Sequence, residues 1–262
     1  MTEHETIKTE QNPLLVIENI EKYFGTKNSN ICKALNNVSF SVEKGEFLGI
    51  MGPSGSGKTT LLNIISTIDT LSKGNIYLNK VNISKIKEKD MTSFRRKNLG
   101  FIFQDFNLLD TLTIHENIAL ALTINNSDSR IVDEKVKTMA QQLGISDILN
   151  KYPFEVSGGQ KQRCACARAI INNPNLIMAD EPTGSLDSHS STVLLETLQN
   201  MNQNMNATIL MVTHDPYSAS YANRILILKD GEISYELLKR DKSRKQFLDE
   251  ILKVLAVMGG NQ

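Results

Sequence analysis

Apolar residues fall along the chain in two patterns. Short, dense apolar runs predict strands at 14–17, 47–51, 176–179 and 208–213, and the last three have the composition of buried parallel strands. Residues 38–42 instead alternate apolar and polar side chains, as in a half-exposed antiparallel sheet. This mixture predicts an α/β core that carries antiparallel strands near its N-terminal end.

Helical spacing dominates the middle of the chain. It occurs in five segments: 60–68, 113–124, 131–143, 158–172 and 188–203. Three of these segments fall between about 105 and 173, where strand signals are weak, so a helical insert is expected there. A hairpin is expected at 225–235, where Asp230 and Gly231 supply the turn.

The last segment, 243–258, has the apolar stripe of an amphipathic helix. The stripe consists of Phe247, Ile251, Leu252, Leu255 and Met258, and Gly259 is placed to cap the helix. We expect this helix to pack on the core, and a docking or dimer helix is the alternative.

The charge and length of the chain narrow the choice of partners. The 262 residues contain 29 Lys plus Arg and 29 Asp plus Glu, and this balance does not favour nucleic acid, which usually requires a basic face. The N-terminal segment lacks the apolar core of a signal peptide, and no apolar run is long enough to cross a bilayer. Cys32, Cys164 and Cys166 lack metal-ligand spacing, so we expect free thiols in a cytoplasmic protein.

One glycine-rich stretch predicts a phosphate site. GPSGSGKT, at 52–59, fits the pattern G-x-x-x-x-G-K-[ST] between a buried strand and a helix. Its backbone N–H groups would surround phosphate, Lys58 would reach the β- and γ-phosphates, and Thr59 would offer its hydroxyl to Mg²⁺. The candidate residues are Gly52, Pro53, Ser54, Gly55, Ser56, Gly57, Lys58, Thr59 and Thr60. Alone, this motif indicates only a nucleoside triphosphate.

Polar side chains follow three of the expected strands. Asp180 and Glu181 close the run LIMADE, where Asp180 suits Mg²⁺ and Glu181 suits a general base. His214 should lie on the same sheet edge, within reach of a γ-phosphate. Gln104 ends the aromatic-rich strand in FIFQD. Neither His214 nor Gln104 is diagnostic alone.

A second anion site is predicted where the helix at 158–172 begins. The stretch VSGGQKQR places Ser157 as an N-cap and exposes the backbone N–H groups of Gly158 and Gly159. An ordinary glycine-bearing turn before a helix would have the same sequence. The motif therefore becomes informative only in combination with the other sites.

In combination, these motifs resemble the ATP-binding subunit of ABC transporters. The order GPSGSGKT, Gln104, SGGQ, LIMADE, SLD and His214 is similar to that family over about residues 14–236. The usual signature begins with leucine, whereas this chain has Val156. The resemblance implies a P-loop NTPase (RecA-like) α/β core with an N-terminal antiparallel β subdomain and an inserted α-helical subdomain.

The resemblance also implies boundaries. The ATP-binding domain would span 14–240, with its helical insert at about 105–173, and a C-terminal helical extension would span 241–262.

Residue roles follow from the same resemblance. Tyr23 would stack on adenine, and Thr59, Gln104 and Asp180 would hold Mg²⁺ beside ATP. Glu181 would be the catalytic base.

Further expectations concern the reaction and the partners. Gln104 would also contact the attacking water, and His214 would contact the γ-phosphate. Asp187 would lie at a dimer seam, and Ser157, Gly158, Gly159 and Gln160 would complete the ATP site of a second copy arranged head to tail. A separate transmembrane permease would hold the subunit on the inner face of the membrane.

A finer resemblance points to a substrate class. The segment FIFQDFNLLDTLTIHENIALAL and the tail FLDEILKVLAVMGG look like the antimicrobial-peptide, bacitracin-type transporters, which are related to the lipoprotein-release and macrolide-export group. This implies export, resistance or sensing of peptide antibiotics, with lipoprotein release or macrolide export as the alternative.

Two other classes compete with this reading. A soluble ABC ATPase acting on ribosomes or DNA usually has two cassettes or a long coiled-coil insert, and this chain shows one cassette and no heptad run. A GTPase or small-molecule kinase would leave SGGQ and His214 unexplained. The guanine-reading N-K-x-D segment is also missing from the sequence.

Overall fold

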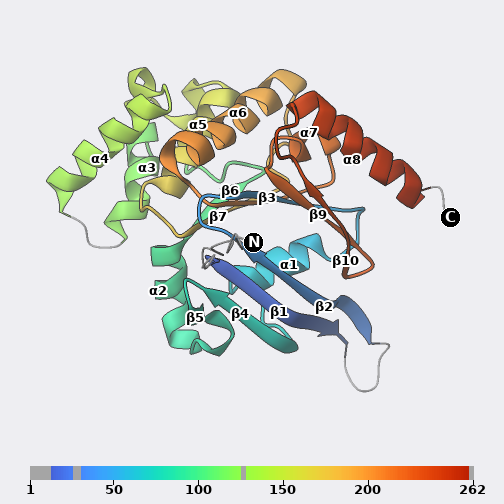
Figure 1. Cartoon of the computed structure of the whole chain (residues 1–262). Coiled ribbons are helices and arrows are strands. Elements are labelled where there is room, and N and C mark those ends of the chain that lie inside the picture. Colours follow the sequence, from blue (N-terminus) through green and yellow to red (C-terminus); the bar gives the residue numbers. More distant parts are fainter. Residues whose placement is uncertain (1–12, 26–30, 125–127, 260–262) are drawn as a thin grey trace, which may run out of the picture.

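The computed structural model describes residues 13–25, 31–124 and 128–259, and the polar segment 1–12 lies outside these ranges. Figure 1 shows a central sheet with most helices on one face and α1 and a second sheet on the other. Among the described residues, no helix combines the length and apolar character needed to span a bilayer.

The central sheet has six strands in the order β10-β9-β3-β8-β7-β6. All of them run parallel except β10, which pairs antiparallel with β9. The strands are β3 (Phe47–Met51), β6 (Leu99–Phe103), β7 (Leu176–Asp180), β8 (Ile209–Thr213), β9 (Arg224–Lys229) and β10 (Glu232–Leu238). This confirms the expected buried strands and the hairpin, whose turn residues Asp230 and Gly231 have φ of 51° and 80°.

Alternate residues of the central strands pack into two separate hydrophobic cores. In β7, Ile177 and Ala179 pack with the helical layer, whereas Leu176 and Met178 pack with the second sheet. Burial on both faces explains why these strands read as dense apolar runs. The sheet is therefore the middle layer of the molecule.

The second sheet is antiparallel, in the order β2-β1-β4-β5. It consists of β1 (Leu15–Phe24), β2 (Cys32–Val42), β4 (Lys73–Leu78) and β5 (Val81–Asn82). β1 is longer than the strand expected at 14–17. Asn19 adopts a φ of 49° and the pairing register shifts there. This irregularity interrupts the alternation of apolar and polar residues, so the sequence pattern revealed only the first part of the strand.

Most of the remaining elements are helices, and they lie on both faces of the central sheet (Figure 1). The helices are α1 (Lys58–Ile65), α2 (Glu88–Asn98), α3 (Ile114–Thr123), α4 (Ser129–Gln142), α5 (Gly158–Ile170), α6 (Ser188–Met205) and α7 (Pro216–Ala219). The four helices expected between 113 and 203 are confirmed. The first helix ends before the predicted residue 68, because Thr67 takes a left-handed φ of 59°.

The C-terminal helix α8 (Arg244–Gly259) packs on the core, as expected. Phe247 and Ile251 are fully buried, and Leu255 and Met258 are half-buried against the same core. Leu252 is 47% exposed, so the predicted stripe was one residue too wide.

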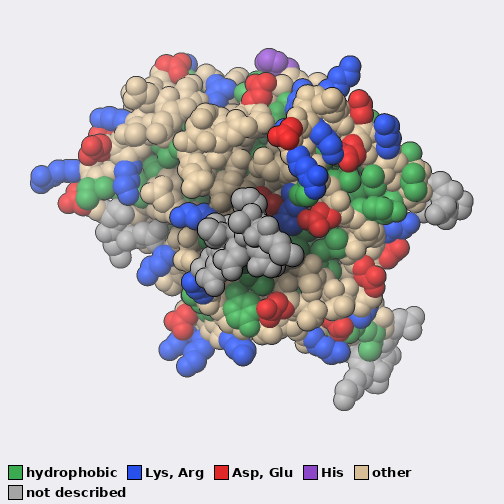
Figure 2. Space-filling model, viewed as in Figure 1, with side chains coloured by type: hydrophobic (Ala, Val, Ile, Leu, Met, Phe, Trp, Pro, Cys, Tyr) green, Lys and Arg blue, Asp and Glu red, His purple; other side chains and the backbone are tan. Residues whose placement is uncertain are grey.

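The remaining composition-based expectations concern thiols and surface charge. The three cysteines are free thiols, with Cys164 and Cys166 buried and Cys32 exposed. Figure 2 shows Lys and Arg side chains interspersed with Asp and Glu over the visible face, so the described residues of that face form no continuous basic patch.

Candidate functional site

The phosphate loop connects β3 to α1, and its glycines are required by the backbone. Gly55 and Gly57 have φ of 80° and 101°. A Cβ on Gly57 would lie 2.5 Å from the Ala34 carbonyl oxygen, and one on Gly52 would lie 2.1 Å from that of Leu228. The loop is therefore wrapped tightly, and its N–H groups are available at the N-terminus of α1, where no side chain caps the helix.

Two distant segments support the loop from outside. The Gly231 N–H, in the β9–β10 turn, donates to the Ser56 carbonyl at 3.2 Å, and the Asn36 N–H donates to the Gly231 carbonyl at 2.8 Å. The hairpin and β2 thus fix the outer side of the loop.

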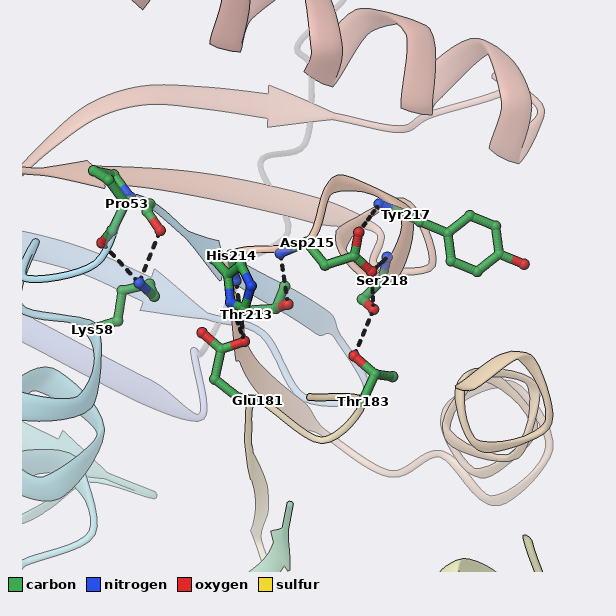
Figure 3. Close-up of polar contacts among 10 residues, drawn as sticks. Pro53, Lys58, Glu181, Thr183, Thr213, His214, Asp215, Tyr217 and Ser218 are labelled. Atoms are coloured by element: carbon green, nitrogen blue, oxygen red, sulfur yellow. Dashed lines mark hydrogen bonds and ion pairs between the residues drawn. The ribbon is translucent and has the colours of Figure 1, made fainter. Parts of the chain in front are cut away.

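Lys58 folds back onto its own loop. Its Nζ donates to the carbonyl oxygens of Gly52, at 2.8 Å, and Pro53, at 3.0 Å (Figure 3). Burial lowers the pKa of Lys58, and the nearby Glu181 and Asp180 carboxylates oppose this shift. The cation is thus held at the mouth of the loop, close to two acids.

Asp180 ends β7 with a buried carboxylate oxygen, Oδ1, that has no hydrogen-bond partner. Burial and, to a smaller extent, Glu181 raise the pKa of Asp180, against the effect of Lys58. An uncompensated buried carboxylate is costly, so this oxygen fits a cation ligand. No group of three His, Cys, Asp or Glu side chains suited to a metal occurs among the described residues. A cation here would therefore need ligands from a hydroxyl, an amide or a phosphate.

Glu181 follows directly and has an unusual backbone. Its φ is 44°, a left-handed value that a non-glycine residue adopts at a cost, and its N–H donates to the Val212 carbonyl at 2.9 Å. Its Oε2 lies 2.8 Å from Nδ1 of His214 and accepts the His214 backbone N–H at 3.3 Å (Figure 3). Two neighbouring strand ends, β7 and β8, thus bring the expected base and histidine together.

Gln104, after β6, lies on the third strand end of the same edge. A Cβ on Gly184 would approach its side chain to 3.0 Å, and Ser185 Oγ donates to its carbonyl at 3.0 Å. Asp187 follows in the same loop and caps α6, accepting the Ser190 N–H at 2.9 Å. Gln104 is therefore joined to the loop that contains Asp187.

A polar network next to this edge of the sheet was not predicted from the sequence. Asp215 accepts hydrogen bonds from the backbone N–H groups of Tyr217 and Ser218 and from Ser218 Oγ. Ser218 Oγ in turn lies 3.0 Å from Thr183 Oγ1 (Figure 3). The network links the segment after Glu181 to the segment after His214. The Asp-Pro pair that starts α7 was the available signal, because it is typical of a helix N-terminus.

Tyr23 lies near the end of β1, beside the phosphate loop. It pairs with Lys33, one residue from Ala34, whose carbonyl touches Gly57. The Lys33 and Lys73 ammonium groups lie 5.5 and 5.8 Å from the centre of its ring, and its hydroxyl donates to Glu21. The ring is thus held beside two lysine ammonium groups.

The SGGQ stretch lies in another layer. Ser157 caps α5, accepting the Gln160 N–H while Gln160 Oε1 accepts the Ser157 N–H. A Cβ on Gly158 or Gly159 would meet nothing within 4 Å. Figure 1 shows α5 and α1 on opposite faces of the central sheet, so the structure does not bring SGGQ into the chain's own phosphate loop.

Comparison with known proteins identifies the family. Residues 35–184 match the family described as ABC transporter, which is more than half of the chain. The chain belongs to the ATP-binding subunits of ABC transporters. It is therefore an ATPase whose fold is the P-loop NTPase fold with an antiparallel β subdomain and a helical insertion, as the sequence predicted.

Two relatives of this ABC ATPase are named as export proteins. It is 52% identical to the bacitracin export ATP-binding protein BceA of Halalkalibacterium halodurans, over 95% of this chain and 98% of that one. It is 43% identical to the macrolide export ATP-binding/permease protein MacB of Campylobacter jejuni, over 86% of this chain and 36% of that longer protein.

A solved relative shows nucleotide in such a cassette. The MJ0796 cassette of Methanocaldococcus jannaschii, a dimer in a post-hydrolysis state with ADP and Pi, has a TM-score of 0.75 to this ABC ATPase. The two are 36% identical over 86% of this chain and 99% of that one.

Proposed function

We propose that this ABC ATPase is the motor subunit of an antimicrobial-peptide transporter of the bacitracin type, and that two copies hydrolyse Mg²⁺-ATP between them. The observation that carries the chemistry is the grouping of Lys58, the unpaired Asp180 carboxylate and the Glu181–His214 pair at one sheet edge. The substrate class rests on the bacitracin-export relative.

The phosphate and metal ligands follow from the geometry. The N–H groups of the loop at 52–60 bind the phosphates, and Lys58 exchanges its bonds to Gly52 and Pro53 for bonds to phosphate oxygens. Thr59, Gln104 and Asp180 would hold Mg²⁺, and the buried Asp180 Oδ1, which has no hydrogen-bond partner, would serve as the anionic ligand. When bound, this ion neutralises charge on the phosphates during transfer. Tyr23 stacks on the adenine.

Glu181 acts as the general base. In this structure its Oε2 contacts the His214 imidazole, which leaves the second oxygen, Oε1, to take a proton from water. The γ-phosphate is an alternative acceptor for a His214 N–H. ATP binding would therefore engage the histidine and release Oε2 of Glu181 in the same step.

The second copy supplies the missing half of the site. Gly158 and Gly159 are open to approach and lie at a capped helix N-terminus, where an anion is favoured. In a head-to-tail pair, Ser157 to Gln160 of one copy contact the nucleotide held by the other, with Asp187 at the seam. The dimer of the MJ0796 relative with ADP and Pi supports the pairing of two copies.

The permease docks in a groove between the core and the helical insert. This cavity has a volume of about 430 Å³ and lies beside α2, β6, α3 and α5. Apolar side chains share it with three arginines: Leu99, Phe101, Phe103, Leu120, Ile124, Arg95, Arg96 and Arg168. Such a groove fits a short helix with apolar and acidic residues, which would place the subunit on the inner membrane face. Gln104, at the end of β6, would transmit the motion.

A resistance assay tests this function. Deletion of the gene in its host should increase sensitivity to bacitracin, and a wild-type copy should restore resistance, whereas a Lys58→Ala copy should not. Unchanged bacitracin sensitivity, combined with increased sensitivity to a macrolide, would favour the macrolide-export alternative. Salt-sensitive binding of the purified chain to ribosomes or DNA would contradict a transport role.

A further inference from the structure

The C-terminal helix α8 reaches the phosphate loop from the far end of the sequence. One cavity of about 370 Å³ is lined by Leu255 and Met258 of α8, by residues 52–54 of the loop, and by His214. Two apolar side chains of α8 thus form one wall of a space whose other walls include the phosphate loop and His214.

The start of α8 is fastened to the segment that carries His214. The Arg244 guanidinium lies 4.8 Å from the ring centre of Tyr217 and 4.6 Å from that of Tyr221. Tyr217 belongs to α7, which begins two residues after His214, and its hydroxyl lies 3.1 Å from Thr192 Oγ1 of α6. Any movement of α8 is therefore opposed by contacts with the histidine segment.

The middle of α8 is anchored as well. Phe247 and Ile251 are fully buried in the core, and Lys242 forms an ion pair with Glu250. From Arg244 to Leu255 the helix extends for about 16 Å. The helix is therefore fixed at its start and in its middle, and its last turns line the cavity shared with the phosphate loop and His214.

We propose that Leu255 and Met258 are positioning residues for ATP hydrolysis, which hold the phosphate loop and His214 in a fixed relation. The inference rests on the roles of the loop and His214 proposed above. His214 needs such support because its side chain is 64% exposed and is bonded mainly to Glu181. Removal of the wall would let both groups shift, and a displacement of about 1 Å in an active site can cost about 10²-fold in rate.

Paired double substitutions on α8 of the full-length chain test this role. Leu255→Ala with Met258→Ala should lower kcat about tenfold, whereas the Kd for ATP should change less than about twofold because the loop N–H groups remain. The control, Leu252→Ala with Val257→Ala, alters two exposed residues of the same helix and should keep wild-type kcat. Leu255→Met with Met258→Leu conserves volume and should restore most of the rate.

Further measurements separate positioning from general destabilisation. The melting temperature and the single substitution Met258→Ala show whether kcat falls in a chain that stays folded. In a His214→Ala background, removal of the wall should cost a smaller factor in kcat than in the wild type, because only the displacement of the phosphate loop then remains to lower the rate. Wild-type kcat in the folded Leu255→Ala, Met258→Ala chain, or an equal loss of kcat in the control, would overturn this inference and leave the proposed function intact. Full hydrolysis by His214→Ala would instead contradict the proposed role of His214, and the inference with it.

Discussion

Single residues at the sheet edge show how the site is prepared for a charged ligand. Lys58 bonds only to backbone carbonyls of its own loop, while Asp180 keeps a buried oxygen without a partner. Both arrangements are costly, since neither buried charge has a hydrogen-bonded counter-ion within the described part of the chain. ATP with a cation would relieve both costs at once.

Lys58 should therefore be required for nucleotide binding. Lys58→Ala removes the cation that reaches the β- and γ-phosphates, and we expect ATP affinity measured by calorimetry to fall at least about tenfold. Lys135→Ala, an exposed lysine on α4, is the matched control and should bind as the wild type does. Unchanged affinity in Lys58→Ala would refute the assignment.

The cysteines should differ in reactivity. Burial raises the pKa of both Cys164 and Cys166 to about 12, so at pH 8 only about 10⁻⁴ of each is thiolate. A thiol-reactive dye should therefore label one cysteine, the exposed Cys32, in the native chain and all three after denaturation. Labelling of the two buried thiols should rise with pH, because the thiolate fraction grows until the pH reaches their pKa. Rapid labelling of three thiols in the native protein at pH 8 would disprove the burial.

At the scale of elements, glycines serve two different purposes. In the phosphate loop, Gly52 is needed by the fold, because a Cβ there would lie 2.1 Å from a backbone carbonyl oxygen. At the start of α5, Gly159 has open space around its Cα, so nothing in this chain demands glycine there. The difference suggests that a second molecule comes close to α5.

Gly159→Ala should separate stability from activity. Alanine favours a helix, so the free energy of unfolding should stay within about 1 kcal/mol of the wild type or rise. ATP hydrolysis should nevertheless fall strongly, because the added methyl group would meet the nucleotide of the partner copy. Full ATPase activity of the folded variant would argue against the shared site. Gly52→Ala is the contrasting control, and should lower stability and activity together.

Local sequence patterns predicted those elements whose pattern is itself local. The dense apolar runs gave the buried strands, and GPSGSGKT and LIMADE gave the two main parts of the site. What escaped prediction depends on contacts between distant segments. The support of the loop by Gly231, the link from Asp215 through Ser218 to Thr183, and the approach of α8 join residues far apart in sequence. The periodicity of hydrophobic residues along the chain carries no information about such contacts.

For the whole molecule, the central question is whether one chain contains a complete site. Its phosphate loop and its SGGQ stretch lie on opposite faces of the central sheet, so each chain offers two halves that cannot meet within it (Figure 1). In a head-to-tail pair, the phosphate loop of each chain would meet the SGGQ stretch of the other, so the pair would contain two complete sites. The ATP between the chains would then be the main connection, and its hydrolysis would let them separate.

The oligomeric state of Glu181→Gln with ATP tests this account most directly. Glutamine cannot accept the proton of the attacking water, so hydrolysis should fall about 10²- to 10⁴-fold while ATP still binds. Light scattering after size exclusion should show twice the mass of the chain with ATP, a single mass without it, and a single mass for Glu181→Gln with Lys58→Ala. A variant that binds ATP and remains monomeric, or that hydrolyses ATP at the wild-type rate, would contradict the account.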